Sequence, residues 1–346
     1  MLRHRQSLLI TLAVAASLSA CSAAEPGNST PSAPAVSASS AGYPVRVHNC
    51  GRELVVQKPP QRIASLDQNT TETLLSLGVG DRVVGTSTWF DPILPELEAA
   101  NADIPRIADN NPSLEAFLAT EPDFVAATFR ADLPGEGSST IESLGQLGLP
   151  VYMAPAECAK ATDGTGDGRR ETPLTMDAAY QEIDELSRIV GVPEAGAKLN
   201  ERIRADLAAA STGDPGAGKT VAFWFANSES PYVAGGYGTP AVSARALGLT
   251  NVFAESRDEW PQVSWEAFAQ KDPDVLVLGD LTRKRQTSET GAVKIAFLES
   301  NPVTKEMTAV KNKRYILLQG SDMHLGVRTP AATAEIAQGL AKVGAR

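Results

Sequence analysis

Two segments of the chain repeat one another, and this repeat limits the possible folds more than any other feature. Residues 113–125 (SLEAFLATEPDFV) align without a gap with residues 264–276 (SWEAFAQKDPDVL), with six identities in thirteen positions. Each copy begins with a serine of the kind that caps a helix, turns at Pro-Asp and ends in an apolar strand. We therefore expect two lobes that share one helix–turn–strand design.

A segment with the features of one long helix, Pro193–Ala210, lies between the two copies. Its proline suits a first helical turn, and its apolar residues recur at helical spacing, at Leu199, Ile203 and Leu207. Residues 211–218 are rich in glycine and end the pattern. We predict a connecting helix over residues 193–212, an N-terminal lobe over 43–192 and a C-terminal lobe over 213–346.

Short apolar stretches alternate with helical ones in both halves. This order predicts an α/β fold: two Rossmann-like lobes with parallel-rich sheets, joined by the single long helix. Ligands of such sheets bind beyond the carboxyl ends of the strands, so we expect a ligand cleft between the lobes. The expected strands are residues 46–56, 62–66, 82–86, 124–128, 220–226, 275–278 and 315–318, and two of the expected helices are 72–77 and 242–247.

The N-terminus has the pattern of an export signal. Arg3 and Arg5 precede an apolar run over residues 8–18, and the run ends in Leu-Ser-Ala-Cys21, which resembles a bacterial lipobox. We predict a lipoprotein signal peptide over residues 1–21 with a lipid on Cys21; the alternative is an ordinary signal peptide with an incidental cysteine. Residues 22–42, mostly Ser, Ala and Pro, predict a disordered tether.

The rest of the chain is acidic and carries two cysteines. Loss of Arg3 and Arg5 from a chain of net charge −10 leaves −12, which argues against a nucleic-acid partner. In an exported protein, Cys50 and Cys158 predict a disulfide. The weaker alternative is a two-cysteine metal site, for which only His48 lies near in sequence, so we expect no metal.

The motifs that suggest catalysis do not fit their context. Residues 213–220 match the P-loop pattern GxxxxGK[ST], but here a helix precedes the loop and a strand follows it, the reverse of what phosphate binding needs. Residues 163–168 resemble the start of an EF-hand loop that lacks its final glutamate. A catalytic serine elbow and a Cys–His pair are also missing from the sequence. We expect neither an enzyme nor a cofactor.

The loops predicted to face the cleft are rich in aromatic and basic residues. Such side chains suit a planar or chelated ligand with negative charge, through stacking and bidentate pairing. Because Trp224 lies within a strand, core packing is an alternative for it. The candidate ligand-binding residues are Trp89, Phe90, Arg130, Trp224, Tyr232, Tyr237, Trp260, His324 and Arg328.

With its lipobox, two lobes, single connecting helix and paired segments, the chain resembles the class III substrate-binding proteins of ABC importers, of the cobalamin and ferric-siderophore type. The resemblance covers about residues 45–345. It implies a lipid-anchored receptor on the outer face of the cell membrane that delivers its ligand to an ABC permease dimer with its ATPase. It also implies that Glu115 and Glu266, one on each lobe, dock into arginine pockets of the permease.

The resemblance leaves the ligand open. A ferric siderophore is the preferred expectation, and the alternatives are cobalamin, haem and a deazaflavin coenzyme precursor. The last comes from a similarity of residues 49–51, 155–158 and 231–238 to an actinobacterial branch of the class. A surface adhesin or an enzyme is a remote alternative that would leave the paired glutamates without a role.

Overall fold

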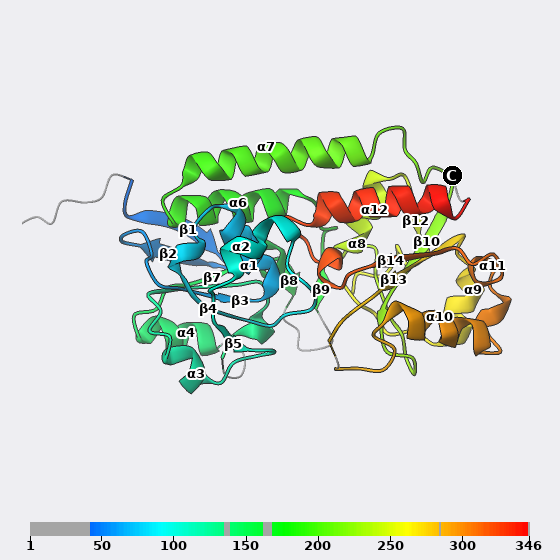
Figure 1. Ribbon diagram of the computed structural model, residues 1–346, viewed down its shortest axis with the longest axis horizontal. Helices are drawn as coiled ribbons and strands as arrows, with labels where there is room; N and C mark the ends of the chain where they lie inside the picture. Colours follow the sequence, from blue (N-terminus) through cyan, green and yellow to red (C-terminus); the bar gives the residue numbers. More distant parts are fainter. Residues whose placement is uncertain (1–41, 135–138, 162–167, 284, 345–346) are drawn as a thin grey trace, which may run out of the picture. The chain divides into compact units, whose positions relative to one another are not determined.

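The computed structural model describes residues 42–134, 139–161, 168–283 and 285–344. Two sheets of five strands organise this part, one in each half of the chain (Figure 1). The predicted signal peptide, Cys21 and almost all of the predicted tether lie outside the described residues, as does most of the EF-hand-like loop. Among the helices that are described, none has the length and apolar character needed to cross a membrane.

The N-terminal sheet is wholly parallel, with the strand order β5-β4-β3-β6-β7. The expected strand over 46–56 is wrong, because a turn at Cys50 and Gly51, both with positive φ, divides it into an antiparallel hairpin. The strands of this half are β1 (Val45–Asn49), β2 (Arg52–Val56), β3 (Ile63–Leu66), β4 (Val83–Ser87), β5 (Arg106–Ala108), β6 (Phe124–Ala127), β7 (Val151–Met153), β8 (Lys160–Ala161) and β9 (Arg169–Arg170). Its helices are α1 (Gln68–Ser76), α2 (Glu98–Asn101), α3 (Leu114–Leu118), α4 (Ser139–Gln146), α5 (Pro155–Cys158) and α6 (Asp177–Ile189).

The C-terminal sheet has the order β11-β10-β13-β14, and β12 also pairs with β10. All of its pairs are parallel except β10 with β11. Its strands are β10 (Thr220–Ala226), β11 (Tyr232–Val233), β12 (Thr250–Asn251), β13 (Val275–Gly279) and β14 (Tyr315–Leu318). Its helices are α8 (Pro240–Ala246), α9 (Trp265–Lys271), α10 (Gly291–Ser300), α11 (Thr308–Lys311) and α12 (Thr329–Lys342). The described residues of the two halves also form five 3₁₀ turns: η1 (Gly80–Arg82), η2 (Pro95–Leu97), η3 (Arg130–Asp132), η4 (Thr304–Glu306) and η5 (Ser321–Met323).

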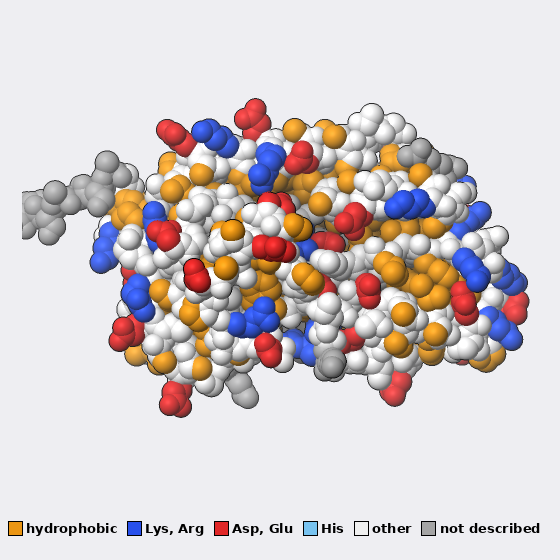
Figure 2. Space-filling model, viewed as in Figure 1, with side chains coloured by type: hydrophobic (Ala, Val, Ile, Leu, Met, Phe, Trp, Pro, Cys, Tyr) orange, Lys and Arg blue, Asp and Glu red, His pale blue; other side chains and the backbone are white. Residues whose placement is uncertain are grey.

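Helix α7 (Pro193–Ala210) joins the two halves and packs against α6 and α12 (Figure 1). Its first half is anchored, because Gly196, Leu199 and Ile203 are buried and a side chain at Gly196 would collide with Ser187. From residue 204 onward its side chains are exposed or half-buried. Figure 2 shows acidic and basic side chains interspersed over this face of the molecule.

The sequence repeat is also a structural repeat. Ser113 caps α3 by accepting a hydrogen bond from the Ala116 N–H at 3.1 Å, and Ser264 caps α9 in the same way at 3.2 Å. After each helix, the aspartate of the Pro-Asp turn holds the start of a neighbouring strand. Asp123 accepts from the N–H of Arg62 before β3, and Asp274 accepts from the N–H of Thr220 in β10, both at 2.9 Å.

Both sheets are covered on both faces, because two apolar clusters pack against each of them. The central strands β6 and β13 are buried at every position, as expected for strands of parallel sheets between helices. The predicted α/β class with two parallel-rich lobes is thereby confirmed.

Candidate ligand-binding site

A cavity of about 450 Å³ lies beyond the carboxyl ends of strands from both sheets, the position expected for ligands of α/β lobes. On the N-terminal side its lining includes the segments after β4, β6 and β7. On the C-terminal side it includes the end of β10 and the segments after β11, β12, β13 and β14. The lining residues are Thr88, Phe90, Thr128, Phe129, Arg130, Ala131, Asp132, Ala154, Ala156, Glu157, Lys160, Ala161, Gly168, Arg170, Phe225, Thr239, Glu259, Trp260, Arg283, Arg285, His324 and Leu325.

The turn after β4 brings Phe90 into the cavity. Thr88 adopts a φ of 56°, a left-handed conformation that non-glycine residues seldom adopt and that is concentrated at functional sites. Its carbonyl accepts from the N–H of Gln68, and the Gln68 side chain accepts from the N–H of Phe90, both at 3.1 Å. The start of α1 therefore holds this cavity-facing turn in place.

Aromatic rings and one guanidinium form a continuous wall on the C-terminal side. Phe225 and Trp260 lie 4.9 Å apart between ring centroids. The guanidinium carbon of Arg283 is 4.9 Å from the Phe225 ring and 5.1 Å from that of Phe90, which belongs to the other half. Cation–π contact thus joins the two sides of the cavity through Arg283.

His324 contributes a neutral ring to the cavity. It packs edge-on against Phe90 at 4.9 Å and Phe129 at 5.1 Å. Burial lowers the pKa of His324 to about 4, so the imidazole is uncharged near neutral pH. Its Nδ1 atom is buried and has no hydrogen-bond partner among the described residues.

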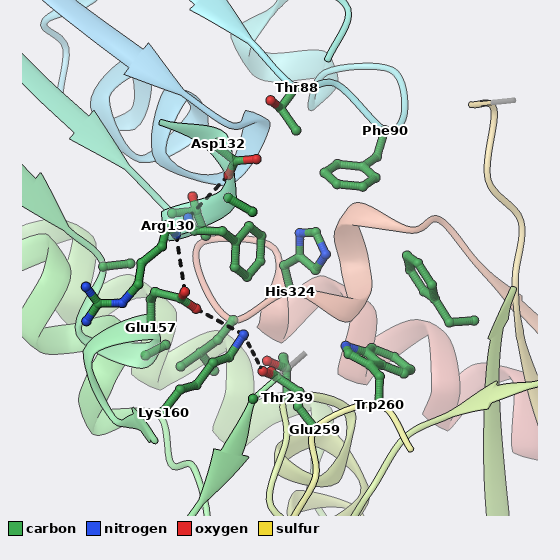
Figure 3. Close-up of a pocket in the computed structure, with 18 of the residues that line it drawn as sticks. Thr88, Phe90, Arg130, Asp132, Glu157, Lys160, Thr239, Glu259, Trp260 and His324 are labelled. Carbon is green, nitrogen blue, oxygen red and sulfur yellow. Dashed lines mark hydrogen bonds and ion pairs between the residues drawn. The ribbon is translucent and has the colours of Figure 1, made fainter. Parts of the chain in front are cut away.

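A chain of charged side chains crosses the floor of the cavity (Figure 3). The Nζ atom of Lys160 lies 3.0 Å from a carboxylate oxygen of Glu157 and 2.8 Å from one of Glu259, which comes from the C-terminal half. Arg170 also pairs with Glu259, at 3.0 Å. Although burial alone would lower the pKa of Lys160, these two carboxylates raise it, so the lysine stays charged.

Four of the nine candidate ligand residues line the cavity: Phe90, Arg130, Trp260 and His324. Arg130 was expected to point its guanidinium at the ligand. Figure 3 shows instead that its side chain points away from His324 and Phe90. Its backbone N–H donates to Glu157 at 3.2 Å. The predicted ligand contact of these four residues stays a prediction.

The other five candidates lie outside the lining. Trp224 is fully buried in the core of the C-terminal half, where it packs against Trp265 at 4.8 Å and donates its Nε1–H to the Ala226 carbonyl. Trp89 stacks under the guanidinium of Arg106. Tyr232 lies in β11, Tyr237 lies under Arg257 at 5.9 Å, and Arg328 is buried against Glu72.

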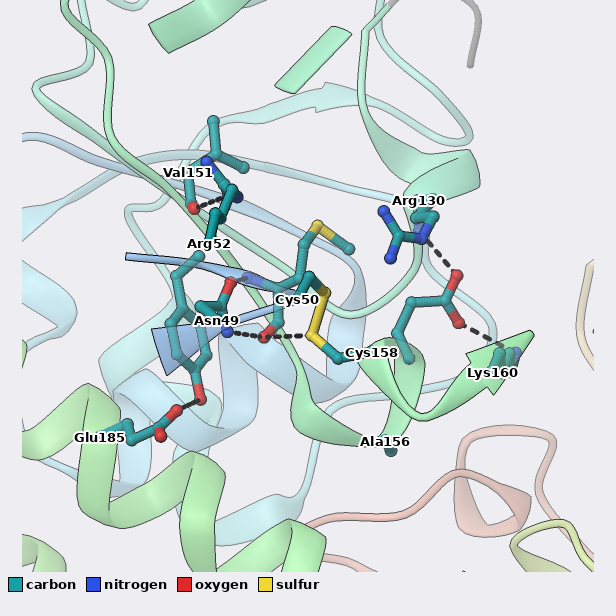
Figure 4. The surroundings of a disulfide bond; sticks show 12 residues. Asn49, Cys50, Arg52, Arg130, Val151, Ala156, Cys158, Lys160 and Glu185 are labelled. Atoms are coloured by element: carbon teal, nitrogen blue, oxygen red, sulfur yellow. Dashed lines mark hydrogen bonds and ion pairs between the residues drawn. A yellow bond between two sulfur atoms is a disulfide. The ribbon is translucent and has the colours of Figure 1, made fainter. Parts of the chain in front are cut away.

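The predicted disulfide between Cys50 and Cys158 is present (Figure 4). It ties the turn of the β1–β2 hairpin to the end of α5, two residues before Lys160. Nearby, the Asn49 side chain exchanges two hydrogen bonds with the backbone of Met153, at 2.8 and 2.9 Å. Within the described ranges, His, Cys, Asp and Glu side chains do not gather into a metal-binding group.

Sequence reasoning missed several lining residues. Phe129 and Glu259 each lie next to a candidate that was named, and Arg283 lies five positions after the predicted strand 275–278. Lys160 and Arg170 could not be predicted as lining residues from the sequence. The short β8–β9 pair, which in turn pairs with residue 258, places them at the cavity. Such contacts between distant residues produce no recognisable local sequence pattern.

Comparison with known proteins agrees with the fold. A family model described as "Periplasmic binding protein" matches residues 63–321. The vitamin B12-binding protein of Vibrio campbellii is 28% identical over 220 residues, which cover 63% of this chain and 70% of that protein.

Solved structures are similar over most of their length. That of an ABC-type Fe³⁺-hydroxamate transport system from Saccharomonospora viridis has a TM-score of 0.70 and 23% identity, and covers 86% of this chain and 99% of its own. The periplasmic heme-binding protein RhuT from Roseiflexus sp. RS-1 has a TM-score of 0.64 and 22% identity, and covers 82% and 98%.

The chain therefore belongs to the periplasmic binding protein family. This confirms the resemblance to class III substrate-binding proteins. The relatives are solute-binding proteins, so the expectation that the chain is not an enzyme is also confirmed.

Proposed function

We propose that this protein is an extracytoplasmic receptor that captures a metal chelate, a ferric siderophore in the first instance, and delivers it to an ABC permease. The observation that carries the proposal is the cavity itself, which has walls from both lobes and an aromatic lining. Its volume of about 450 Å³ falls in the range of roughly 300–1,000 Å³ that is usual for small-molecule sites.

Cobalamin is the second candidate, because the curated relatives include vitamin B12-binding proteins. The similar solved structures include an ABC-type Fe³⁺-hydroxamate transport system and a heme-binding protein. The siderophore, cobalamin and haem are therefore tested side by side.

Tryptophan fluorescence tests this proposal, because Trp260 lines the cavity and the fully buried Trp224 does not. We expect saturable quenching when the purified full chain is titrated with a ferric hydroxamate, and the Trp260→Phe variant should lose most of that signal while still binding in calorimetry. Haemin, cyanocobalamin and a deazaflavin serve as competing ligands. If none of the ferric chelates bound and one of these did, the cargo would be reassigned to it.

The proposed docking of the receptor onto the permease rests on Glu115 and Glu266. Both are exposed in the first turn of equivalent helices, α3 and α9, on different lobes. Paired acidic points of this kind would orient the receptor on a basic permease surface. We expect Glu115→Ala with Glu266→Ala to abolish uptake with ligand affinity unchanged; exposed Glu194→Ala on α7 is the control. Loss of ligand binding in the double variant would contradict the assignment.

The lipid anchor on Cys21 and the location on the outer face of the cell membrane complete the proposal. They rest on the lipobox pattern and the export signal of the sequence. Mass spectrometry of the protein recovered from the membrane of its host would detect a diacylated cysteine at the new N-terminus. A soluble product cut elsewhere would contradict the anchor.

A further inference from the structure

One border of the cavity is formed by a segment of the C-terminal half that reaches the N-terminal half. After β13, residues 281–283 and 285–289 lead to α10, and we call them the strap. Arg283 and Arg285 of the strap line the cavity, whereas the side chains of Thr282 and Arg285 are exposed to solvent. The strap therefore lies between the cavity and the solvent.

Three side chains of the strap contact the N-terminal half. The Thr282 hydroxyl donates to the carbonyl of Phe90, and the Arg285 Nε–H donates to the side-chain oxygen of Asn110, both at 2.5 Å. The guanidinium of Arg283 lies 5.1 Å from the Phe90 ring. Because Phe90 follows β4 and Asn110 follows β5, these contacts join the two halves at the edge of the cavity.

The carboxylate of Glu289 holds the strap from the inside. It accepts from the Nε–H of Arg283 at 3.0 Å and from the backbone N–H groups of Arg285 and Gln286 at 2.9 and 3.1 Å. Glu289 is buried, so water does not compete for these bonds. One residue that does not line the cavity thus fixes the part of the strap that contacts the other half.

The two ends of the strap are tied together by Lys294 on α10. Its buried Nζ atom donates to the carbonyls of Gly279 and Glu289, both at 2.7 Å. The N–H of Leu281 donates to the same Glu289 carbonyl at 3.0 Å. These bonds all lie within the C-terminal half, so they do not depend on the contacts that the strap makes with the N-terminal half.

We propose that the strap restricts the passage of solutes into and out of the cavity, and that Glu289 is the positioning residue that keeps it against the N-terminal half. A solute that passes the strap must first break the hydrogen bonds of Thr282 and Arg285 and move Arg283 away from Phe90. The two hydrogen bonds join protein groups only, so their loss should speed entry and exit alike and change the affinity little. The inference concerns access to the cavity and does not depend on which ligand the receptor carries.

Acrylamide, a small collisional quencher, measures this access through Trp260, which lines the cavity. The full chain is used with Trp89→Phe, because Trp89 is half-buried and lies outside the lining. The signal of the same chain with Trp260→Phe, which leaves only the buried Trp224 and Trp265, is subtracted. The difference is the quenching of Trp260 alone.

The strap is released from the N-terminal half by Thr282→Val with Asn110→Ala. Both residues are exposed and outside the lining, so circular dichroism should show an unchanged fold, while the quenching constant of Trp260 should rise at least about twofold. Thr287→Val is the matched control, because the partners of its hydroxyl, Asn227 and Ser228, belong to the same half. It should leave the quenching unchanged.

The role of Glu289 is tested by combining variants. Glu289→Gln should raise the quenching of Trp260 by at least as much, and adding Asn110→Ala to it should then have little further effect, because the strap is already free. A general loss of packing would give additive effects instead, and additivity would contradict the positioning role. If Glu289→Gln fails to fold, Glu289→Asp takes its place, because the shorter carboxylate cannot reach all three of its donors.

Stopped-flow mixing with the ferric hydroxamate proposed above extends the test to a ligand. In Thr282→Val with Asn110→Ala, association and dissociation should both be faster by about tenfold, with the Kd within about threefold of the wild type. Unchanged quenching of Trp260 in this variant, or an equal rise in Thr287→Val, would overturn the inference and leave the receptor role standing. If no chelate bound, the choice of cargo would fall, and acrylamide alone would decide on the strap.

Discussion

Among single residues, buried carboxyl groups without a cation partner are the ones through which pH acts on stability. Glu182 on α6 is fully buried, and its Oε1 atom has no hydrogen-bond partner among the described residues. Burial, with the charges of Asp67 and Glu185 nearby, raises the pKa of Glu182 from 4.5 to about 8. The folded protein therefore prefers this side chain uncharged.

The sign of the pH effect follows from that preference. The stabilisation is complete below the ordinary pKa of a glutamate and is lost as the pH rises through about 8. Glu182→Gln keeps the shape and stays neutral, so at pH 8 we expect it to be more stable than the wild type by about 2–4 kcal/mol, with no gain at pH 4.5. Urea unfolding at both pH values measures this, with exposed Glu194→Gln as the control; equal gains at both would contradict it.

Also among single residues, the sequence was enough to identify site residues in the loops that follow strands. Phe90, Arg130 and His324 were identified because parallel strands end at one edge of a sheet. The sequence does not show which face of the sheet a residue within a strand occupies. Trp224 was therefore predicted to bind the ligand, although its ring is buried in the core. The sequence also does not show which cations are already paired, since ion pairs such as Lys160–Glu259 join residues far apart in sequence.

At the level of elements, the disulfide holds a segment that carries three charged residues of the cavity lining, Glu157, Lys160 and Arg170. In the described residues of this segment, the chain forms the short helix α5 and the two-residue strands β8 and β9. Cys158 fastens its start to the β1–β2 hairpin. The covalent bond and the ion pairs with Glu259 thus hold the segment from its two ends.

Cys50→Ser with Cys158→Ser should therefore affect both stability and binding. The closed loop spans 108 residues, for which chain entropy predicts a loss of about 4–5 kcal/mol as an upper value. We also expect weaker ligand binding, because Lys160 is no longer held in place. Denaturant unfolding and calorimetry measure the two effects. Unchanged affinity in a folded double variant would show that the ion pairs alone position the wall.

Elements were easier to predict than site residues. Strands β10 and β14 have the predicted bounds, and helix α7 begins at the predicted residue and ends at Ala210, two residues before the predicted boundary at 212. Strong apolar patterns between clear breakers define all three elements. Helix α1 begins four residues earlier than expected, at Gln68. Its first turn is polar and gives no periodic signal, and it forms because Asp67 caps it by accepting from the Asn69 N–H at 2.8 Å.

In the whole molecule, the two lobes contact each other through buried polar groups as well as through α7. Arg328 forms a bidentate pair with Glu72, with both distances 2.6 Å, and the N–H of Ser321 donates to Asp91 at 2.8 Å. The Asn69 side chain donates to the Leu325 carbonyl at 3.1 Å. Lys160 and Glu259 join the lobes at the cavity itself. These contacts restrict the opening of the lobes, in addition to the stiffness of one connecting helix.

We therefore predict that ligand binding changes the distance between the lobes only slightly, and that the Arg328–Glu72 pair is a main cause. Small-angle scattering of the wild-type protein should give the same radius of gyration, within error, with and without ligand. Arg328→Met alone leaves Glu72 buried without its cation and should cost about 3–5 kcal/mol of stability. Arg328→Met with Glu72→Gln removes both charges, should recover most of that loss, and should open the ligand-free form enough for a compaction on binding to be measured. A large compaction already in the wild type would show that these contacts open in solution and that the lobes move as a wide hinge.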